Sequence, residues 1–194
     1  MGDFRIILFN KPYGTLSCFS DPEGRETLKA YIDLPDVYSA GRLDYDSEGL
    51  LLLTDDGSLI HQLTDPQHHI PKTYLAQVEG PVTEEALDRL RPGLFIQGYQ
   101  TRPCRTEKIA EPQLWPRRKP ITPHAPPEWI SLTLAEGKKR QIRHMTAAVG
   151  LPTLRLVRVA IGPLVLGNLQ PGEWRDLDRK STRLNSSHEW KPRM

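Results

Sequence analysis

Three carboxylates and one arginine lie close together in the first third of the chain: Arg42, Asp44, Asp46 and Glu48. A rigidly held carboxylate can act as a nucleophile or as a general base, and two neighbouring carboxylates can bind Mg²⁺. The same spacing also suits a loop whose charges are solvated. Spacing alone leaves both interpretations open.

Four leucines follow these acids at positions 50–53. A run of this length is too short to span a membrane and is typical of a buried strand. Asp55, Asp56 and Gly57 then form a turn signal. The pattern therefore predicts a polar loop at the start of a buried strand, where an enzyme can hold a carboxylate rigidly.

Other residue types that could do chemistry have simpler interpretations. His68 and His69 are interpreted as a loop dipeptide, because no further ligand is recognised near them at metal-binding spacing. Cys18 and Cys104 are far apart and form no CxxC pattern. Lys11 does not belong to a glycine-rich phosphate loop. The sequence predicts neither a metal nor a cofactor.

The segments between these residues predict an α+β domain with a mixed, largely antiparallel sheet and few helices. One short helix is expected between Thr83 and Pro92, which supply its cap and its stop. Two further helices are expected at 58–63 and 138–149, and strands are expected at 4–9, 50–53, 72–80, 94–110, 129–136, 154–161 and 164–169.

Residues 111–128 contain six prolines and little periodicity, so they are predicted to form an exposed loop or arm. Arg117, Arg118 and Lys119 lie beside Trp115 in this segment. Such a basic and aromatic cluster can contact RNA, although a solvated loop is the commoner explanation.

The chain has 194 residues, enough for one domain or for two lobes that share a cleft. No apolar stretch reaches the length of a membrane span, so a cytoplasmic protein is expected. The net charge is +2, but residues 178–194 hold five basic and two acidic residues. Without them the totals of 26 basic and 24 acidic residues leave a net charge of −1. Any affinity for a polyanion must therefore come from local clusters.

Residues 178–194 also read like the translation of a common sequencing-adapter oligonucleotide, and they have no apolar periodicity. We interpret them as a disordered assembly artefact and take residues 1–177 as the domain. The alternative is a native basic tail that contacts nucleic acid. Resequencing the locus decides between the two.

Four motifs in order resemble those of the pseudouridine synthases, in the branch that contains the small-subunit ribosomal enzyme A. The central one is residues 41–51, and the others are residues 11–14 (KPYG), 72–74 (KTY) and 136–145 (EGKKRQIRHM). The resemblance covers nearly all of residues 4–177. One departure is His144, where an arginine is usual.

The resemblance implies the pseudouridine synthase fold, with two lobes that flank a central active-site cleft, and conversion of uridine to pseudouridine without metal or cofactor. Asp44 would be the catalytic nucleophile or base. Arg143 would pair with Asp44 and keep it ionised. Tyr74 would pack on the target uracil and assist removal of the C5 proton. Arg42 would support the nucleotide once it is flipped out of its stack.

The same resemblance implies a substrate, which is 23S rRNA or a large-subunit precursor. No N-terminal S4-like RNA-binding domain is expected, and a monomer is predicted. The candidates for contacts with the RNA backbone are Lys138, Lys139, Arg140, Arg117 and Arg118. Each of these basic residues could also be an ordinary solvated side chain.

Two other functions remain open at this point. The first is a non-catalytic RNA-binding or ribosome-assembly protein on the same scaffold. The second is a nuclease in which Asp44 and Asp46 bind Mg²⁺. Loss of activity in EDTA would favour the nuclease, whereas release of the C5 hydrogen of uridine would favour the synthase.

Overall fold

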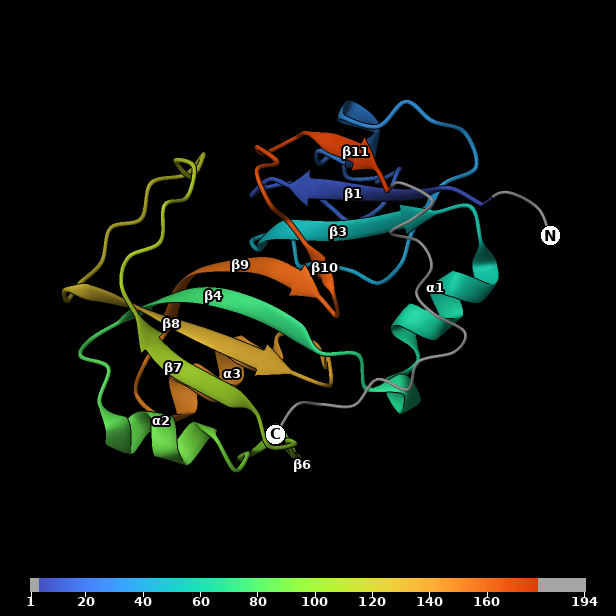
Figure 1. The fold of residues 1–194 in the computed structure, drawn as a ribbon. Helices are drawn as coiled ribbons and strands as arrows, with labels where there is room; N and C mark the ends of the chain where they lie inside the picture. Colours follow the sequence, from blue (N-terminus) through green and yellow to red (C-terminus); the bar gives the residue numbers. More distant parts are fainter. Residues whose placement is uncertain (1–3, 178–194) are drawn as a thin grey trace.

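The computed structural model describes residues 4–177, so the predicted artefactual tail at 178–194 lies outside the described residues (Figure 1). Three α-helices and two 3-10 helices occur in the described part: α1 (Gly57–Thr64), α2 (Glu84–Leu90), α3 (Gln141–Ala148), η1 (Leu28–Ala30) and η2 (Pro66–His68). The strands are β1 (Ile6–Lys11), β2 (Tyr38–Ser39), β3 (Glu48–Thr54), β4 (Lys72–Glu79), β5 (Phe95–Ile96), β6 (Tyr99–Gln100), β7 (Arg105–Ile109), β8 (Pro127–Leu134), β9 (Thr153–Ile161), β10 (Leu164–Val165) and β11 (Trp174–Asp176).

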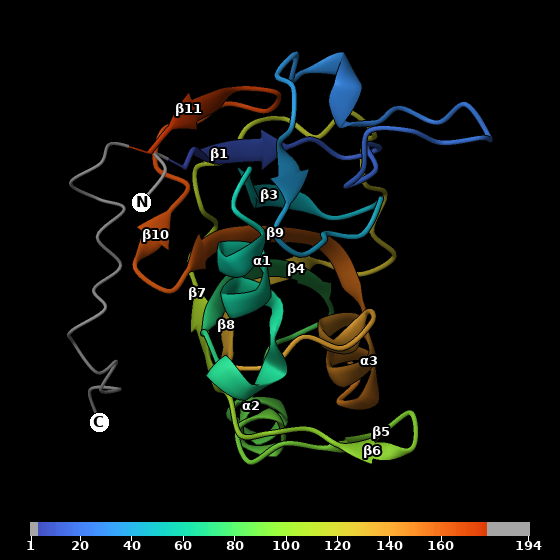
Figure 2. The ribbon, with the colours of Figure 1, turned by 90° about the vertical axis from the view of Figure 1, so that its right-hand side faces the viewer.

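Within the described residues nine strands form one sheet with the central order β11-β1-β3-β9-β4-β8-β7. All neighbours are antiparallel except β3 and β9, which are parallel and pair only at Glu48 with Val157 and at Gly49 with Arg158. The sheet therefore consists of two antiparallel halves joined by one short parallel contact. Figure 2 shows β1, β3 and β11 in one half, and β4, β7 and β8 in the other.

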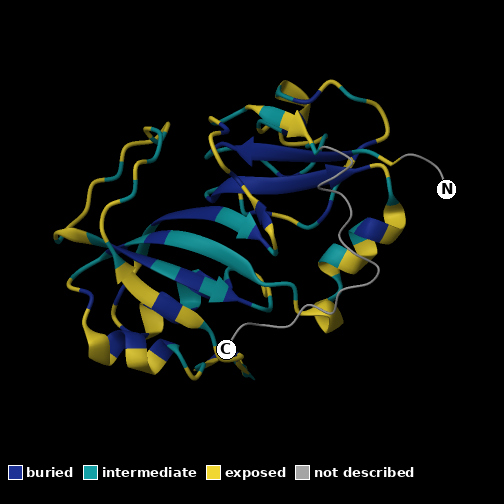
Figure 3. Cartoon of the chain, viewed as in Figure 1, coloured by how far each residue is buried: buried dark blue, intermediate teal, exposed yellow. Residues whose placement is uncertain are grey.

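The leucine run forms β3 and is buried on both of its faces (Figure 3). Leu50 and Leu52 belong to one apolar cluster, which β10 and the segment after it complete. Leu51 and Leu53 belong to a second cluster, which η1 closes. Because side chains alternate along a strand, a continuous apolar run is what two separate cores require. This strand gives the polar loop before it a rigid, dry support.

The other half of the sheet is covered on one face by α2 and α3. Leu87 and Leu90 of α2 and Met145 of α3 lie in one buried cluster with Ile130 and Leu132 of β8. No helix in residues 4–177 is long and apolar enough to cross a membrane.

Gly49 lies at the junction of the two halves and has a φ of +106°. A Cβ added at Gly49 would lie 2.2 Å from the backbone oxygen of Arg158. The parallel contact between β3 and β9 therefore requires glycine, both for its conformation and for its size.

We expect Gly49→Ala to lower the free energy of unfolding by at least about 2 kcal/mol, because it combines left-handed strain with a backbone clash. In a domain of this size the Tm should fall by at least about 4 °C. Gly57→Ala is the matched control, since Gly57 begins α1 and a Cβ there meets nothing within 4 Å. Equal Tm values for the two variants would contradict this interpretation of the junction.

The structure changes several of the expected segments. Residues 94–110 form the three short strands β5, β6 and β7, and the strand expected at 164–169 is limited to Leu164–Val165. The helix predicted at 138–149 begins three residues later, because Arg140 precedes it in the left-handed region with a φ of +54°. The proline-rich segment 111–128 is only partly an exposed arm. Trp115 packs against the cluster of Leu50 and Leu52, and its Nε1 donates to the carboxylate of Glu48 at 2.9 Å.

Candidate active site

A cleft of about 530 Å³ opens beside the short parallel contact, between the two halves of the sheet. Its walls come from the loop before β3, the start of β4, strand β9 and the segment before α3. Six of the predicted site residues line the cleft. They are Arg42, Asp44, Tyr74, Lys138, Lys139 and Arg140.

The loop that carries Asp44 is held by hydrogen bonds from residues 14–17, which lie at the end of the first motif and just after it. Ser17 Oγ accepts from the amide of Leu43 at 3.0 Å and donates to its carbonyl at 2.8 Å. The Gly14 amide donates to the carbonyl of Tyr45 at 2.9 Å. The loop is therefore bonded on both sides of Asp44, while the Asp44 side chain stays about one third exposed.

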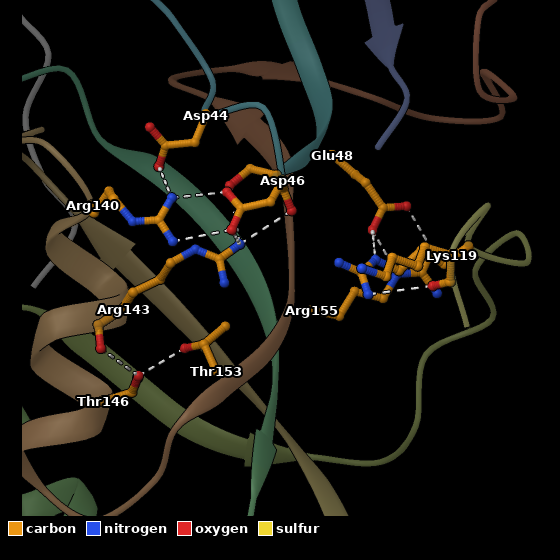
Figure 4. Close-up of polar contacts among 11 residues, drawn as sticks. Asp44, Asp46, Glu48, Lys119, Arg140, Arg143, Thr146, Thr153 and Arg155 are labelled. Carbon is orange, nitrogen blue, oxygen red and sulfur yellow. Dashed lines mark hydrogen bonds and ion pairs between the residues drawn. The ribbon is translucent and has the colours of Figure 1, made fainter. Parts of the chain in front are cut away.

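Asp46 joins this loop to two arginines of the later motif (Figure 4). Arg140 donates two parallel hydrogen bonds to its carboxylate, at 2.9 and 3.0 Å. Arg143 Nη2 lies 3.5 Å from Asp46 Oδ2 and donates to the Asp46 carbonyl at 3.2 Å. Bidentate arginine pairs fix geometry as well as charge, so Asp46 sets where both guanidinium groups lie.

The predicted pair of Asp44 with Arg143 is wrong in this structure. The cation nearest to Asp44 is Arg140, whose Nη1 lies 3.7 Å from Asp44 Oδ2, and Arg143 contacts Asp46 instead. Arg140 has a left-handed backbone conformation, and its side chain extends to the loop that carries Asp44 and Asp46. Arg143 lies inside α3 and reaches the loop at the Asp46 carbonyl, 3.2 Å away, and at Ser47 Oγ, 3.5 Å away.

Charge and burial have opposite effects on the pKa values of Asp46 and Arg143. Burial would raise the pKa of Asp46, but the Arg140 hydrogen bonds and the charge of Arg143 outweigh it and lower the pKa. Burial also lowers the pKa of Arg143 against the attraction of Asp46. Asp46 is therefore ionised at neutral pH and holds both cations.

Residues 5–148 match the sequence model of the RNA pseudouridylate synthase family. The chain belongs to this family. Ribosomal large subunit pseudouridine synthase E of Vibrio vulnificus is 50% identical over 183 residues, which cover 93% of this chain and 78% of that protein. The protein of the same name from Xanthomonas campestris pv. campestris is 51% identical over 183 residues, which cover 92% of this chain and 98% of that protein.

A solved structure described as a pseudouridylate synthase has the same fold as this family member, with a TM-score of 0.78 and 33% identity. The match covers 93% of this chain and 73% of the solved chain. The predicted family and the predicted α+β fold with a mixed, mainly antiparallel sheet are both confirmed.

Of the synthase's predicted RNA-contacting residues next to α3, Lys138 and Lys139 are exposed, whereas Arg140 is half-buried and bound to Asp46. Lys138 Nζ lies 4.7 Å from the ring centre of Tyr99. Arg42 is exposed and lines the cleft from the loop before β3. The three exposed cations can meet phosphate without first breaking a salt bridge.

The two arginines of the proline-rich segment already have partners within the synthase. Arg117 stacks over the ring of Tyr13 at 3.9 Å, and Arg118 forms an ion pair with Glu26 at 2.5 Å. Neither residue lines the cleft. In this structure both arginines fasten the segment to the half of the sheet that contains β1.

Sequence reasoning missed the partner of Glu48. Glu48 is buried and accepts two hydrogen bonds from Arg155 of β9, each at 2.9 Å. Arg155 also donates to the carbonyl of Trp115 at 2.9 Å. The available signal was an arginine inside an otherwise apolar strand, because a buried charge needs a partner. Figure 4 shows this pair apart from the cluster around Asp46.

Sequence reasoning also missed two basic residues of the cleft wall, Arg158 and Lys72. Arg158 is buried and donates from Nε to the carbonyl of Leu50 at 2.8 Å, while its Nη2 has no partner among the described residues. Lys72 lies in the cleft wall with Arg158, and burial lowers the pKa of this lysine. The floor of the cleft is thus positively charged.

Lys11, set aside in the sequence, is fully buried directly before the Gly14 turn. Its Nζ donates to the carbonyls of Pro12 at 2.9 Å and Thr15 at 2.7 Å. Burial lowers its pKa to about 7, although the three acids of the loop attract the proton.

This pKa predicts how stability depends on pH. Between about pH 7 and pH 10.4 the unfolded chain keeps a proton on Lys11 that the folded chain releases, so the free energy of unfolding rises with pH. Relative to Lys11→Met, the native protein should gain at most about 1.4 kcal/mol per pH unit. Urea titrations at several pH values measure this difference, with the exposed Lys29→Met as control. A difference that stays constant with pH would contradict the shifted pKa.

Proposed function

We propose that this synthase isomerises a uridine of the 23S rRNA of the large ribosomal subunit to pseudouridine. The single observation that carries the proposal is the position of Asp44, about one third exposed, in the wall of a cleft with Tyr74. The relatives named for the large ribosomal subunit, about 50% identical over most of this chain, support the choice of substrate.

The reaction needs a carboxylate and no redox step. The N1–C1′ bond of uridine breaks, the base turns, and C5 bonds to C1′; C5 loses its hydrogen and N1 gains one. Asp44 acts as the nucleophile or base in this exchange. Arg140 Nη1 lies 3.7 Å from the Asp44 carboxylate and helps to position it. Arg143 acts indirectly, through Asp46.

Tyr74 enters the cleft from β4, opposite Arg158 in the register between β4 and β9. We place the uracil against its ring, because stacking on an aromatic side chain compensates for the base stacking that is lost on flipping. The target nucleotide must leave its stack to reach Asp44 at all.

The cationic rim would hold the RNA backbone. Lys138 and Lys139 line the cleft from the segment before α3 and Arg42 lines it from the loop before β3, so all three can neutralise phosphates beside the flipped nucleotide. The body of the chain is nearly neutral, which leaves shape and these local contacts to select the site. A monomer in the cytoplasm stays a prediction, which sedimentation velocity and cell fractionation would test.

The proposal is tested by the hydrogen that the reaction must release. The native protein should release tritium from large-subunit rRNA labelled at uridine C5, at the same rate with and without EDTA. Carbodiimide mapping of rRNA from cells with and without the gene should then identify one uridine that loses its modification. Unchanged maps and no tritium release would favour a purely RNA-binding protein, and EDTA-sensitive strand cleavage would favour a nuclease.

A further inference from the structure

Two histidines and an aspartate converge on the connection between β3 and β4. His61 lies in α1, Asp65 directly follows α1, and His68 ends η2. One ligand atom from each of the three residues lies within 4.8 Å of the others. His61 Nδ1 is 3.7 Å from Asp65 Oδ2. The expectation that His68 and His69 are a plain loop dipeptide overlooked Asp65 and His61 at helical spacing.

We propose that His61, Asp65 and His68 bind one divalent transition-metal ion of the Zn²⁺ class. Imidazole nitrogen and carboxylate oxygen are ordinary ligands of such ions, with bonds of about 2.0–2.2 Å. Three ligands at that length lie about 3.4 Å apart around a tetrahedral ion. The observed separations, up to 4.8 Å, are wider than this value, and the two imidazoles that must turn to close the gap are exposed.

The backbone already holds the three residues in place. The amide of Asp65 donates to the carbonyl of His61 at 2.9 Å, and the amide of His68 donates to the carbonyl of Asp65 at 3.1 Å. Asp65 Oδ1 accepts from the amide of Gln67 at 2.8 Å. That bond orients the carboxylate and leaves Oδ2 facing His61, as an outer-shell partner orients a ligand in a metal site.

His69 does not belong to this site. It has a φ of +47°, and its Nε2 lies 3.2 Å from Nη1 of Arg102. The left-handed backbone of His69 directs its side chain away from the cluster of His61, Asp65 and His68. The site therefore has three protein ligands and leaves the remaining position to water.

The site lies outside the reacting centre but beside the cleft. Leu63 and Thr64, which lie between His61 and Asp65 in sequence, form part of the cleft wall. A bound ion would link α1 to η2 and stiffen that wall. It has no part in the isomerisation, which needs no metal.

Isothermal titration of the untagged full chain with ZnCl₂ tests the proposal. His188, outside the described residues, is replaced by alanine in every protein of the series so that it contributes no ligand. One equivalent of Zn²⁺ should bind. His61→Ala and His68→Ala should each weaken binding at least about tenfold. His124→Ala, an exposed histidine on the proline-rich segment, should leave binding unchanged.

Hydrogen exchange supplies the second measurement. Zn²⁺ should slow exchange of the amides at 61–69 in the native protein and should not do so in the His61→Ala/His68→Ala double variant. Absence of stoichiometric binding would overturn the proposal. Binding that survives in the double variant would also overturn it, since the ion would then lie elsewhere.

Discussion

The Asp44→Asn variant is expected to form no detectable pseudouridine, a loss of at least about 10⁴-fold, and to bind the same RNA at least as tightly as the native protein. Asparagine matches the size of Asp44 but carries no charge to attract Arg140, which lies 3.7 Å away. It is neither a nucleophile nor a base at neutral pH. Single-turnover tritium release and filter binding at one fixed salt concentration separate chemistry from affinity.

Two matched substitutions in the same part of the chain sharpen this test. Asp46→Asn should reduce activity only partly, because it loosens Arg140 and Arg143 and leaves the reacting carboxylate in place. Asp55→Asn, at the other end of β3 and exposed, should leave activity unchanged. Retained activity in Asp44→Asn, or an equal loss in all three variants, would contradict the assignment.

The Glu48→Gln variant is expected to lose about 3–5 kcal/mol of unfolding free energy. Glu48 is 1% exposed and is the only carboxylate within salt-bridge distance of Arg155 in the described chain. Its removal leaves a buried guanidinium charge without a counter-charge, and desolvation of that charge is the source of the loss. Urea denaturation at pH 7 measures it.

Glu84→Gln makes the same chemical change in an exposed ion pair with Arg91, so it should cost about 1 kcal/mol or less. The double variant Glu48→Met/Arg155→Met should recover part of the loss, because it removes both charges of this pair together. If Glu48→Gln lowered the free energy of unfolding as little as Glu84→Gln, the buried pair of Glu48 and Arg155 would not stabilise the junction of β3 and β9.

Much of the fold could be predicted from periodicity. β3 and β8 were found because their apolar patterns depend on nearby residues alone. β11 was missed, since its three residues, Trp174–Asp176, show no period of their own and form a strand only by pairing with β1. The start of α3 was misplaced because Arg140 has a left-handed backbone conformation that the apolar period of the sequence does not indicate.

The candidate site, like the fold, could be predicted only in part from the sequence. Asp44 could be proposed as the reacting carboxylate because its motif is local. Its nearest cation could not, since Arg140 and Arg143 are both compatible with the sequence and only the backbone before α3 decides between them. The pair of Glu48 with Arg155 spans 107 positions, and no local pattern encodes a contact over that distance. The proposed ligand set of His61, Asp65 and His68 depends on the positions of α1 and η2, which bring the three residues together.

The pairing of β1 with β11 has a consequence for synthesis of the protein. Ile7 pairs with Asp176, so β1 is completed by a strand that is synthesised much later. Until β11 leaves the ribosome, the outer edge of β1 has unpaired amides and carbonyls that can pair with another chain. Contacts this distant in sequence also form slowly. We therefore expect the growing chain to depend on chaperones most in the interval before residue 176 emerges.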